Sequence, residues 1–440
     1  MPSKKNITDL GEFKPSEGAD PLQYLSSWTK DHGDTIRYKT ALGNFYFFNH
    51  PSDADLVFKN KDIVRLSFLK MVLGEGLLSS EGPHWRKQRS IAMPHFTCGQ
   101  VLNYLPLIVS EVNKMLSKWR DNARRKDTID LARDVNLLTM NIILKAVYSY
   151  SLDDETDRAL HEAISVLITD LSGLSKMAFI PEMTVSSTRL KTVQNALATL
   201  EDVVEKILEN RKRDPNPPKD FLHSLLNAAD RDTGKPLDKV AIRDEIVTTM
   251  ISGNETTALV IAWAWSLLNH HPSAEEKLYQ ELDTVLDGRT PGAEDLLKLN
   301  WTDLVLKETM RLFPPVWIVS RRAALEVKVG EHVVKEGDSV ILCPYTTHRH
   351  PEFWDSPELF NPARFASSDF GANQNPAYFP FGGGRHLCLG MHFALIEATI
   401  VMAMIGQQFR IKPVRKGIPA MDPGITLRLL NGYPVTLESI

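Results

Sequence analysis

A cysteine stands at the end of a glycine-rich segment, directly before an apolar run with helical spacing. The segment covers residues 381–390 and reads FGGGRHLCLG, with Cys388 in its eighth position. Backbone N–H groups at the start of a helix, together with the helix dipole, favour a thiolate over a thiol. Glycines let the backbone come close to a flat partner, so Cys388 is a candidate axial ligand to haem iron. The alternative is a buried structural cysteine, the usual state of a free thiol, but five residue types at fixed positions are rarely met by chance.

A second candidate site is a polar patch inside a long apolar helical pattern, residues 244–269. The patch contains Ser252, Gly253, Glu255 and Thr256. A glycine inside a helix costs about 1 kcal/mol relative to alanine, and hydroxyl side chains can bond back to carbonyls and bend the helix. An acid beside a hydroxyl can deliver protons to a bound reactant. The patch therefore predicts proton chemistry, with a packing site for a neighbouring helix as the alternative.

The segment around Cys388 resembles the haem-binding loop of the cytochrome P450 family, the haem-thiolate monooxygenases. Position 386 is more often arginine in that family, and His386 resembles the variant of soluble bacterial members. The resemblance implies haem b with Cys388 as its axial iron ligand, His386 near a propionate and Gly382 close to the cofactor. It also implies that Phe381 packs near the sulfur and keeps water away from it.

The polar patch is similar to the oxygen-activating acid–alcohol pair of the same family. The resemblance implies that Thr256 holds an oxygen of bound O2 by a hydrogen bond and that Glu255 relays protons, both in a widened helical turn. Gly253 is expected against the cofactor. Ser252 departs from the usual small apolar residue, and we expect it to contact either water or substrate.

Two arginines, Arg89 and Arg321, are candidates for binding the haem propionates. Trp85 and Arg89 resemble the Trp-x-x-x-Arg of the family, whose indole N–H and guanidinium suit a propionate. Because further basic residues lie beside them in the sequence, the alternative is a basic cluster on the surface that binds no propionate. Arg321 is the expected second propionate arginine, and its neighbour Arg322 could replace it.

Glu308 and Arg311 lie three residues apart and therefore share one face of an expected helix. Such pairs are common on exposed helices and contribute only a few tenths of a kcal/mol. Because the pair lies between the two motifs in the sequence, it resembles the buried Glu-x-x-Arg of the family. Arg364 would be the third member of this triad. The resemblance implies a structural role for the triad, clamping the loop that leads to the cysteine.

The substrate pocket is expected to draw on residues 65–78, 167–183, 316–319 and 424–426, together with one face of the central helix. Most small-molecule sites are apolar, so a terpenoid, a fatty acyl compound or another natural product is the expected substrate. For any one candidate, an ordinary core position is an equally good interpretation. The individual candidates are Val247, Met250, Val316, Trp317, Ile318 and Ile425.

The composition is that of an ordinary globular protein without a bias toward nucleic acid. The chain has 440 residues, 43% hydrophobic and 24% charged, with a formal net charge of −4. Three cysteines are too few for a disulfide framework and fit a reducing compartment. The N-terminal residues resemble neither a signal peptide nor a membrane anchor, and the longest apolar run, 258–265, is shorter than a membrane span. We therefore expect a soluble, cytoplasmic protein.

The secondary-structure pattern predicts one helix-rich body with small sheets. Residues 98–285 have helical periodicity, residues 35–49 alternate as a hairpin around Gly43 and Asn44, and short strands follow residue 313. The resemblance implies that residues 1–440 form a single cytochrome P450 haem domain, mainly α with minor β sheets. The haem would lie between the long central helix and the helix that follows the cysteine loop.

The resemblance implies an enzyme that activates O2 to hydroxylate or epoxidise a small apolar substrate. The sequence ends about fifty residues beyond Cys388, so we expect no fused reductase domain and a monomer that receives two electrons from a separate protein. A small acidic ferredoxin or flavodoxin, itself reduced by its own reductase, would dock against Arg86, Lys87 and Arg385. Two alternatives are a peroxide-using peroxygenase or isomerase, which the Glu255–Thr256 pair argues against, and a non-catalytic haem sensor or electron carrier.

Overall fold

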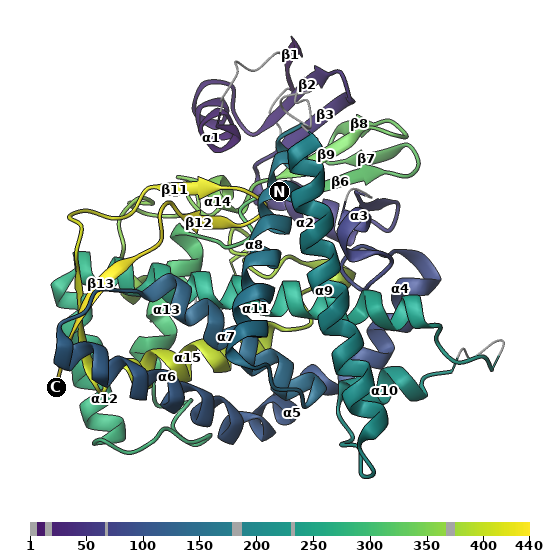
Figure 1. Cartoon of the computed structure of the whole chain (residues 1–440). Coiled ribbons are helices and arrows are strands. Elements are labelled where there is room, and N and C mark those ends of the chain that lie inside the picture. Colours follow the sequence, from purple (N-terminus) through teal and green to yellow (C-terminus); the bar gives the residue numbers. More distant parts are fainter. Residues whose placement is uncertain (1–6, 14–19, 67–68, 178–186, 230–233, 367–374) are drawn as a thin grey trace.

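The computed structural model describes residues 7–13, 20–66, 69–177, 187–229, 234–366 and 375–440 (Figure 1). Helices form most of the molecule and the strands form small sheets, as the periodicity predicts. The helices are α1 (Pro21–Asp31), α2 (Pro51–Lys59), α3 (Lys70–Leu73), α4 (Gly82–Ala92), α5 (Cys98–Asn103), α6 (Leu105–Arg125), α7 (Leu131–Tyr148), α8 (Asp154–Met177), α9 (Ser187–Arg213), α10 (Phe221–Asn227), α11 (Lys239–His270), α12 (Pro272–Leu286), α13 (Asn300–Leu312), α14 (Pro344–Thr347) and α15 (Met391–Gly406).

The largest sheet joins strands from both ends of the chain. Its order is β1-β2-β3-β9-β6-β4, so the N-terminal hairpin pairs with strands that follow residue 313. Its strands are β1 (Thr8–Glu12), β2 (Thr35–Thr40), β3 (Gly43–Phe48), β4 (Ile63–Arg65), β6 (Val319–Ala323) and β9 (Ser339–Leu342). The smaller sheets contain β5 (Ile129–Asp130), β7 (Val327–Val329), β8 (His332–Val334), β10 (Phe409–Pro413), β11 (Met421–Pro423), β12 (Leu427–Leu429) and β13 (Pro434–Ser439).

The predicted hairpin is present, but its turn lies earlier than Gly43 and Asn44. β2 and β3 pair from Thr35 opposite Phe48 to Thr40 opposite Gly43, so Ala41 and Leu42 form the turn. Gly43 has a φ of 116°, a backbone conformation that other residues rarely adopt. The glycine therefore ends the turn and does not occupy its centre.

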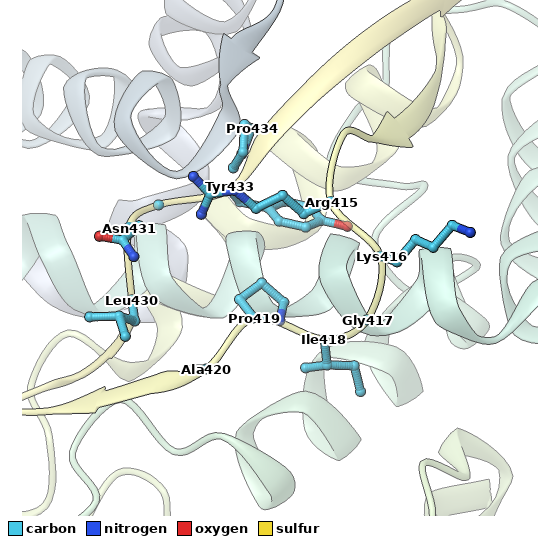
Figure 2. Close-up of a pocket in the computed structure, with 11 residues that line it drawn as sticks. Arg415, Lys416, Gly417, Ile418, Pro419, Ala420, Leu430, Asn431, Tyr433 and Pro434 are labelled. Carbon is cyan, nitrogen blue, oxygen red and sulfur yellow. The ribbon is translucent and has the colours of Figure 1, made fainter.

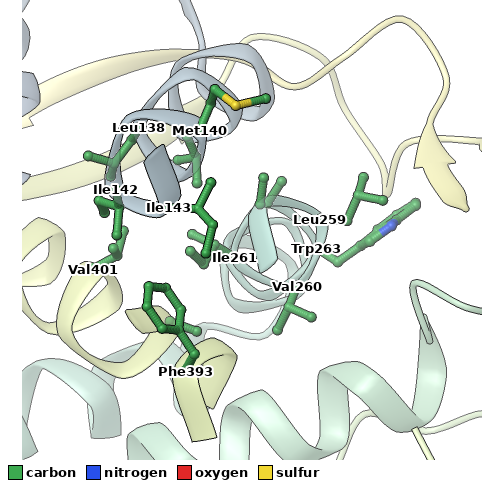
Figure 3. Close-up of a cluster of buried hydrophobic side chains, with 14 of the residues drawn as sticks. Leu138, Met140, Ile142, Ile143, Leu259, Val260, Ile261, Trp263, Phe393 and Val401 are labelled. Atoms are coloured by element: carbon green, nitrogen blue, oxygen red, sulfur yellow. The ribbon is translucent and has the colours of Figure 1, made fainter. Parts of the chain in front are cut away.

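The central helix α11 crosses the molecule and is buried along most of its length. Asp238 caps its start, where the side chain accepts a hydrogen bond from the N–H of Ala241 at 2.8 Å. The helix packs against α7 and α15, and Figure 3 shows Ile143, Ile261 and Phe393 from these three helices together in the core. Burial on all sides leaves few places where α11 can meet a ligand.

The structure brings Glu308, Arg311 and Arg364 together in the interior. Glu308 and Arg311, both 0% exposed, lie on α13 and form a two-bond ion pair at 2.7 and 2.8 Å. Arg364 Nε lies 3.1 Å from the same carboxylate. The remaining N–H groups of Arg311 donate to the carbonyls of His348, Pro357 and Leu359. All five guanidinium donors are thus used, and this cluster holds residues 348–361 in place.

Candidate active site at the cysteine loop and the central helix

The glycines before Cys388 fit the loop against helix α2. Gly382 and Gly384 have φ values of 74° and 61°, which favour glycine. A Cβ on Gly384 would lie 2.1 Å from the carbonyl oxygen of Phe58, and one on Gly383 would lie 2.9 Å from its ring. Gly383 and Gly384 therefore allow the loop to pack closely against α2. Gly382 has the backbone conformation of a turn. The loop closes where the N–H of Cys388 donates to the carbonyl of Phe381 at 3.0 Å.

Two residues separate Cys388 from the start of α15, and an arginine lies beside it. Burial raises the pKa of its thiol, while the backbone N–H of Gly390 and the charge of Arg89 oppose that rise. The backbone donor expected from the sequence is therefore in place, and Arg89 adds a positive charge that we did not expect there, but burial outweighs both. A thiolate here needs a bonded cation, as a metal ion would supply.

The other two cysteines do not combine these features. Cys343 is completely buried, and burial raises its pKa to about 11. Cys98 is exposed at the start of the short helix α5. Cys388 keeps accessible surface although the surrounding protein desolvates it strongly, which is expected for a side chain that faces an internal space. Within the described ranges, no three His, Cys, Asp or Glu side chains converge as a metal site.

Basic side chains gather beside the cysteine loop. Trp85 packs edge-on against His386 with ring centroids 4.5 Å apart, and Arg89 lies 5.5 Å from the centre of the Trp85 ring. Arg89 donates to the carbonyl of Leu387 at 3.1 Å. Trp85 Nε1 is buried and has no hydrogen-bond partner among the described residues, and such a donor usually has one. The predicted propionate residues of α4 and the loop are therefore adjacent, with an indole donor available.

Two arginines that face each other extend this cluster. Arg65 on β4 is the direct register partner of Arg321 on β6. Burial and the neighbouring arginines lower the pKa of both groups to about 10. Arg385 also repels both guanidinium groups. Like charges directly opposite on paired strands are destabilising, so this arrangement suits an anionic ligand.

Glu81 brings one carboxylate into the cluster. Its oxygens lie 2.9 Å from the N–H of Arg65, 3.3 Å from Arg385 Nη2 and 3.2 Å from His386 Nε2. Burial acts to raise the pKa of Glu81, but the hydrogen bonds and charges of His386 and Arg65 lower it to about 2. One carboxylate does not balance Arg65, Arg89, Arg321 and Arg385. The two propionates of a haem fit the excess of positive charge.

Three residues of this cluster were not expected from the sequence to lie near the haem propionates. Arg65 was expected in the substrate pocket, Arg385 was expected in a docking surface, and Glu81 was not singled out. Their proximity depends on the pairing of β4 with β6, which no local spacing reveals. Arg322, the alternative to Arg321, is exposed and next to it on the strand, so its side chain points to the opposite face.

The predicted polar patch is where α11 opens. Between residues 244 and 268, the residues that are not buried are Ile251, Ser252, Gly253 and Thr256. Ser252 Oγ donates to the carbonyl of Thr248 at 2.7 Å, and Thr256 Oγ1 donates to the carbonyl of Ser252 at 3.1 Å. A free thiol, an unbalanced arginine cluster and a polar opening on a buried, mainly apolar helix thus occur in one molecule.

A sequence model of the cytochrome P450 family matches residues 2–433. The chain belongs to the cytochrome P450 family. Cyclooctat-9-en-7-ol 5-monooxygenase of Streptomyces melanosporofaciens is 30% identical over 416 residues, covering 92% of this chain and 87% of the relative. Pentalenene oxygenase of Streptomyces avermitilis is 30% identical over 401 residues, covering 89% and 87%. The chloroplastic carotene epsilon-monooxygenase of Arabidopsis thaliana is 27% identical over 438 residues, covering 93% and 80%. The protein is a cytochrome P450 monooxygenase.

The central helix of this P450 differs from expectation at Gly253. A Cβ there would lie 2.9 Å from Cγ1 of Ile143 on α7. The glycine therefore allows close packing of two helices, which is the alternative explanation given by the sequence. The helix also continues as an α-helix through the patch, without the widened turn that we expected.

Glu255 is buried and bonds to the hairpin of β11 and β12. Its oxygens accept hydrogen bonds from Thr426 Oγ1 and Arg428 Nε, both at 2.8 Å. Arg428 also reaches Thr169 of α8 at 3.2 Å. Proton transfer by Glu255 therefore requires this ion pair to loosen.

The six pocket candidates divide into two groups. Val247 and Met250 are completely buried. They lie on other faces of α11 than Thr256. At 3.6 residues per turn, the nine positions from Val247 to Thr256 leave a net rotation of about 180°, and the six from Met250 leave one of about 120°. Trp317 is 2% exposed and its indole N–H donates to the carbonyl of Gly424 at 2.8 Å. The burial of these three side chains favours the alternative interpretation, an ordinary core position.

Val316, Ile318 and Ile425 remain as pocket candidates. Val316 is 39% exposed, and the other two are partly buried. The N–H of Leu427 donates to the carbonyl of Pro315 at 2.9 Å, which places the β11–β12 turn beside residues 316–318. Part of the expected segment 167–183, residues 178–183, lies outside the described residues.

A separate hollow of about 220 Å³ lies between residues 415–420 and 430–434 (Figure 2). Arg415 and Tyr433 border it, and Tyr433 Oη donates to Asn269 Oδ1 at 2.7 Å. None of the candidate site residues lines this hollow. In the parts of the chain that the structure describes, no helix combines the length and apolar character needed to cross a membrane.

Proposed function

We propose that this P450 binds haem b through Cys388 and oxygenates a small terpenoid with O2. The observation that supports this proposal most directly is that Cys388 has accessible surface and lies beside several arginines with one carboxylate, Glu81, among them. The bound haem supplies oxygen activation, with the thiolate donating electron density. One oxygen atom enters the substrate as a hydroxyl or epoxide, and the other leaves as water after two electrons and two protons are consumed.

The protein side chains have separate roles in this proposal. Arg65, Arg89 and Arg321 bind the propionates, and the indole N–H of Trp85 donates to one of them. His386 orients Glu81 within this cluster. Thr256 Oγ1, on the open face of α11, binds and transfers a proton to the reacting oxygen.

Proton supply to Thr256 would come through Glu255. Release of Arg428 from Glu255 would free that carboxylate to exchange protons. The contact of Arg428 with Thr169 connects the pair to the partly exposed side of α8. The same ion pair thus sets when protons reach the site.

The terpenoid class rests on the relatives and on the pocket side chains. The relatives' names describe oxygenation of cyclooctat-9-en-7-ol, pentalenene and carotene. Val316, Ile318 and Ile425 give the pocket apolar side chains, as such substrates need. Fatty acyl compounds are the competing class within the same pocket.

Electrons would come from a small acidic ferredoxin or flavodoxin and its reductase. Arg86 is exposed on α4, next to Lys87 and near the cysteine loop. Arg385 is less suited to docking than we expected, because it donates to the carbonyl of Lys61 and contacts Glu81. Reversing the charge of Arg86 and Lys87 should therefore slow reduction at low salt, whereas unchanged rates would exclude this surface.

The haem ligand is tested by the spectrum of the reduced protein with carbon monoxide. The wild type should give the red-shifted band of a thiolate ligand, and Cys388→Ser should lose it. Cys98→Ser, a matched change at an exposed cysteine, should keep it. A wild type without the band, or a Cys388→Ser variant with full turnover, would contradict the proposal.

Substrate class is tested on the haem-loaded wild type. Cyclic terpenes should shift the haem absorption band at lower concentrations than straight-chain fatty acids of equal carbon number. The reverse order would assign the pocket to fatty acyl compounds.

A further inference from the structure

Ser252 is the one exposed residue between positions 244 and 268 of the central helix α11. It is exposed, whereas Ile251, Gly253 and Thr256 beside it are partly buried and the rest of residues 244–268 are buried. The sequence singled out Ser252 as a departure from a small apolar residue, and the proposed oxygen chemistry assigns it no role. An exposed hydroxyl at this opening can meet whatever occupies the pocket.

The hydrogen bond of Ser252 determines what kind of group it can bind. Its hydroxyl hydrogen is used in the 2.7 Å bond to the carbonyl of Thr248. A serine oxygen has two lone pairs as well as its hydrogen, so Ser252 Oγ remains an acceptor. A ligand that meets it must bring its own hydrogen-bond donor.

Proton transfer is a poor use of Ser252. Neighbouring acids face elsewhere, since Glu255 pairs with Arg428 and Asp244 accepts from the N–H of Glu75. Ser252 also lies one turn, about 6 Å along the axis, from Thr256. A hydroxyl without an adjacent acid suits binding better than acid–base catalysis.

The other side chains proposed for the pocket are apolar. Val316, Ile318 and Ile425 contribute hydrocarbon side chains, and the hydroxyl of Thr426 is used on Glu255. A hydrocarbon substrate would leave Ser252 Oγ without a donor. A substrate with one hydroxyl would satisfy it while its skeleton contacts the apolar side chains.

We propose that Ser252 recognises a hydroxyl group already present on the substrate, so that this P450 prefers a monohydroxylated terpenoid over the parent hydrocarbon. This inference rests on the proposed function and specifies its substrate class. The substrate hydroxyl donates to Ser252 Oγ, and the bond holds the skeleton so that a carbon near the hydroxyl faces the haem. Ser252 is thus a specificity-determining residue.

Matched ligands can separate this role from simple pocket filling. The haem-loaded protein is titrated with p-menthane, menthol and menthyl methyl ether, then with cedrane, cedrol and cedryl methyl ether, following the haem absorption band. The ethers keep the oxygen but cannot donate. Because a neutral hydrogen bond changes affinity roughly twofold to tenfold, the wild type should bind each alcohol at least threefold more tightly than its ether and hydrocarbon.

Three variants assign the preference to the Ser252 hydroxyl. Ser252→Ala should abolish the alcohol preference and leave hydrocarbon and ether affinities within twofold of the wild type. Ser252→Thr, which keeps a hydroxyl, should retain the preference. Ser266→Ala removes a completely buried serine from the same helix and should change nothing.

Several outcomes would overturn the inference. The first is a wild type that binds alcohols no more tightly than ethers and hydrocarbons. The second is a Ser252→Ala variant that binds all the ligands more weakly by the same factor. The third is a Ser252→Ala variant whose only change is more peroxide release, which would assign Ser252 to binding water or oxygen. A missing thiolate band with carbon monoxide would instead refute the proposed function. A normal band without alcohol preference refutes this inference alone.

Discussion

Arg65 and Arg321 stand directly opposite each other in the antiparallel pair of β4 and β6. Directly opposite residues on one face of a sheet have Cβ atoms about 5 Å apart. Burial lowers the pKa of both guanidinium groups, and the charge of Arg321 lowers that of Arg65 further. Glu81 is the carboxylate that interacts with both. The pair therefore costs stability unless a further anion lies between them.

Replacing Arg321 should have opposite effects on the haem-free and haem-loaded protein. Arg321→Gln removes the repulsion, so the free energy of unfolding without haem should rise by up to about 1 kcal/mol. Haem affinity should fall roughly tenfold or more, because a charge-assisted bond to a propionate is lost. Haem titration and urea unfolding measure the two effects.

Arg322→Gln is the matched control for this change. Arg322 is exposed on the same strand and points to the other face, so haem affinity should stay unchanged. Equal losses of affinity in both variants would mean that surface charge, and not the paired arginines, attracts haem.

Gly76 allows the segment 74–80 to lie directly on α11. A Cβ at Gly76 would be 2.0 Å from Thr248 Oγ1 and 2.6 Å from the carbonyl oxygen of Asp244. The N–H of Glu75 donates to Asp244 at 2.8 Å, and the N–H of Leu77 bonds Glu245. Gly76→Ala should displace the segment and lower the free energy of unfolding by about 1–3 kcal/mol.

Gly99→Ala provides the comparison for Gly76→Ala in thermal or urea unfolding. Gly99 lies in α5, and nothing is within 4 Å of a Cβ built there. Alanine should raise stability by about 0.5–1 kcal/mol at this helical position. If Gly76→Ala were as well tolerated, the close contact with α11 would not be important for stability.

Glu245 should make stability depend on pH. The side chain is 1% exposed, and burial raises its pKa from 4.5 to about 8, with Asp244 adding to the rise and the Leu77 N–H opposing it. The folded protein thus holds a proton that the unfolded chain releases above about pH 4.5. The stabilising contribution is complete below that pH and is lost as pH rises through 8.

Urea unfolding between pH 5 and 8 measures this effect. The wild type should lose up to about 1.4 kcal/mol per pH unit more than Glu245→Gln, which carries no titrating group. Glu209→Gln, at an exposed ion pair of α9, should follow the wild type. Parallel curves for the wild type and Glu245→Gln would show that Glu245 ionises normally in the folded protein.

The sequence predicted features that depend on local spacing. Cys388 with its glycines and the Glu308–Arg311 pair are each defined within one short segment, so their residue types already limit the geometry. The opening at Ser252 and Thr256 was also predictable, because polar side chains interrupt an apolar helix.

Features that depend on strand pairing or helix phase were missed. Arg65 becomes an Arg321 neighbour only when β4 and β6 pair. The spacing of Val247 from Thr256 already places the two residues on opposite faces of α11. Glu81 gave no signal of its own, because its role depends on basic residues from three separate segments.

Thr256 should control how electrons are used, without controlling whether haem or substrate binds. Its hydroxyl lies on the open face of α11, bonded to the carbonyl of Ser252, so removing it leaves the cysteine loop and the arginine cluster unchanged. Thr256→Ala should keep the thiolate band and ligand affinity, but product per electron pair should fall roughly tenfold or more, because a general acid–base group contributes 10²–10⁴ in rate. The missing electrons should appear as hydrogen peroxide. Thr256→Ser keeps the hydroxyl and should restore most of the coupling, whereas a Thr256→Ala variant with full coupling would mean that protons reach the oxygen without this residue.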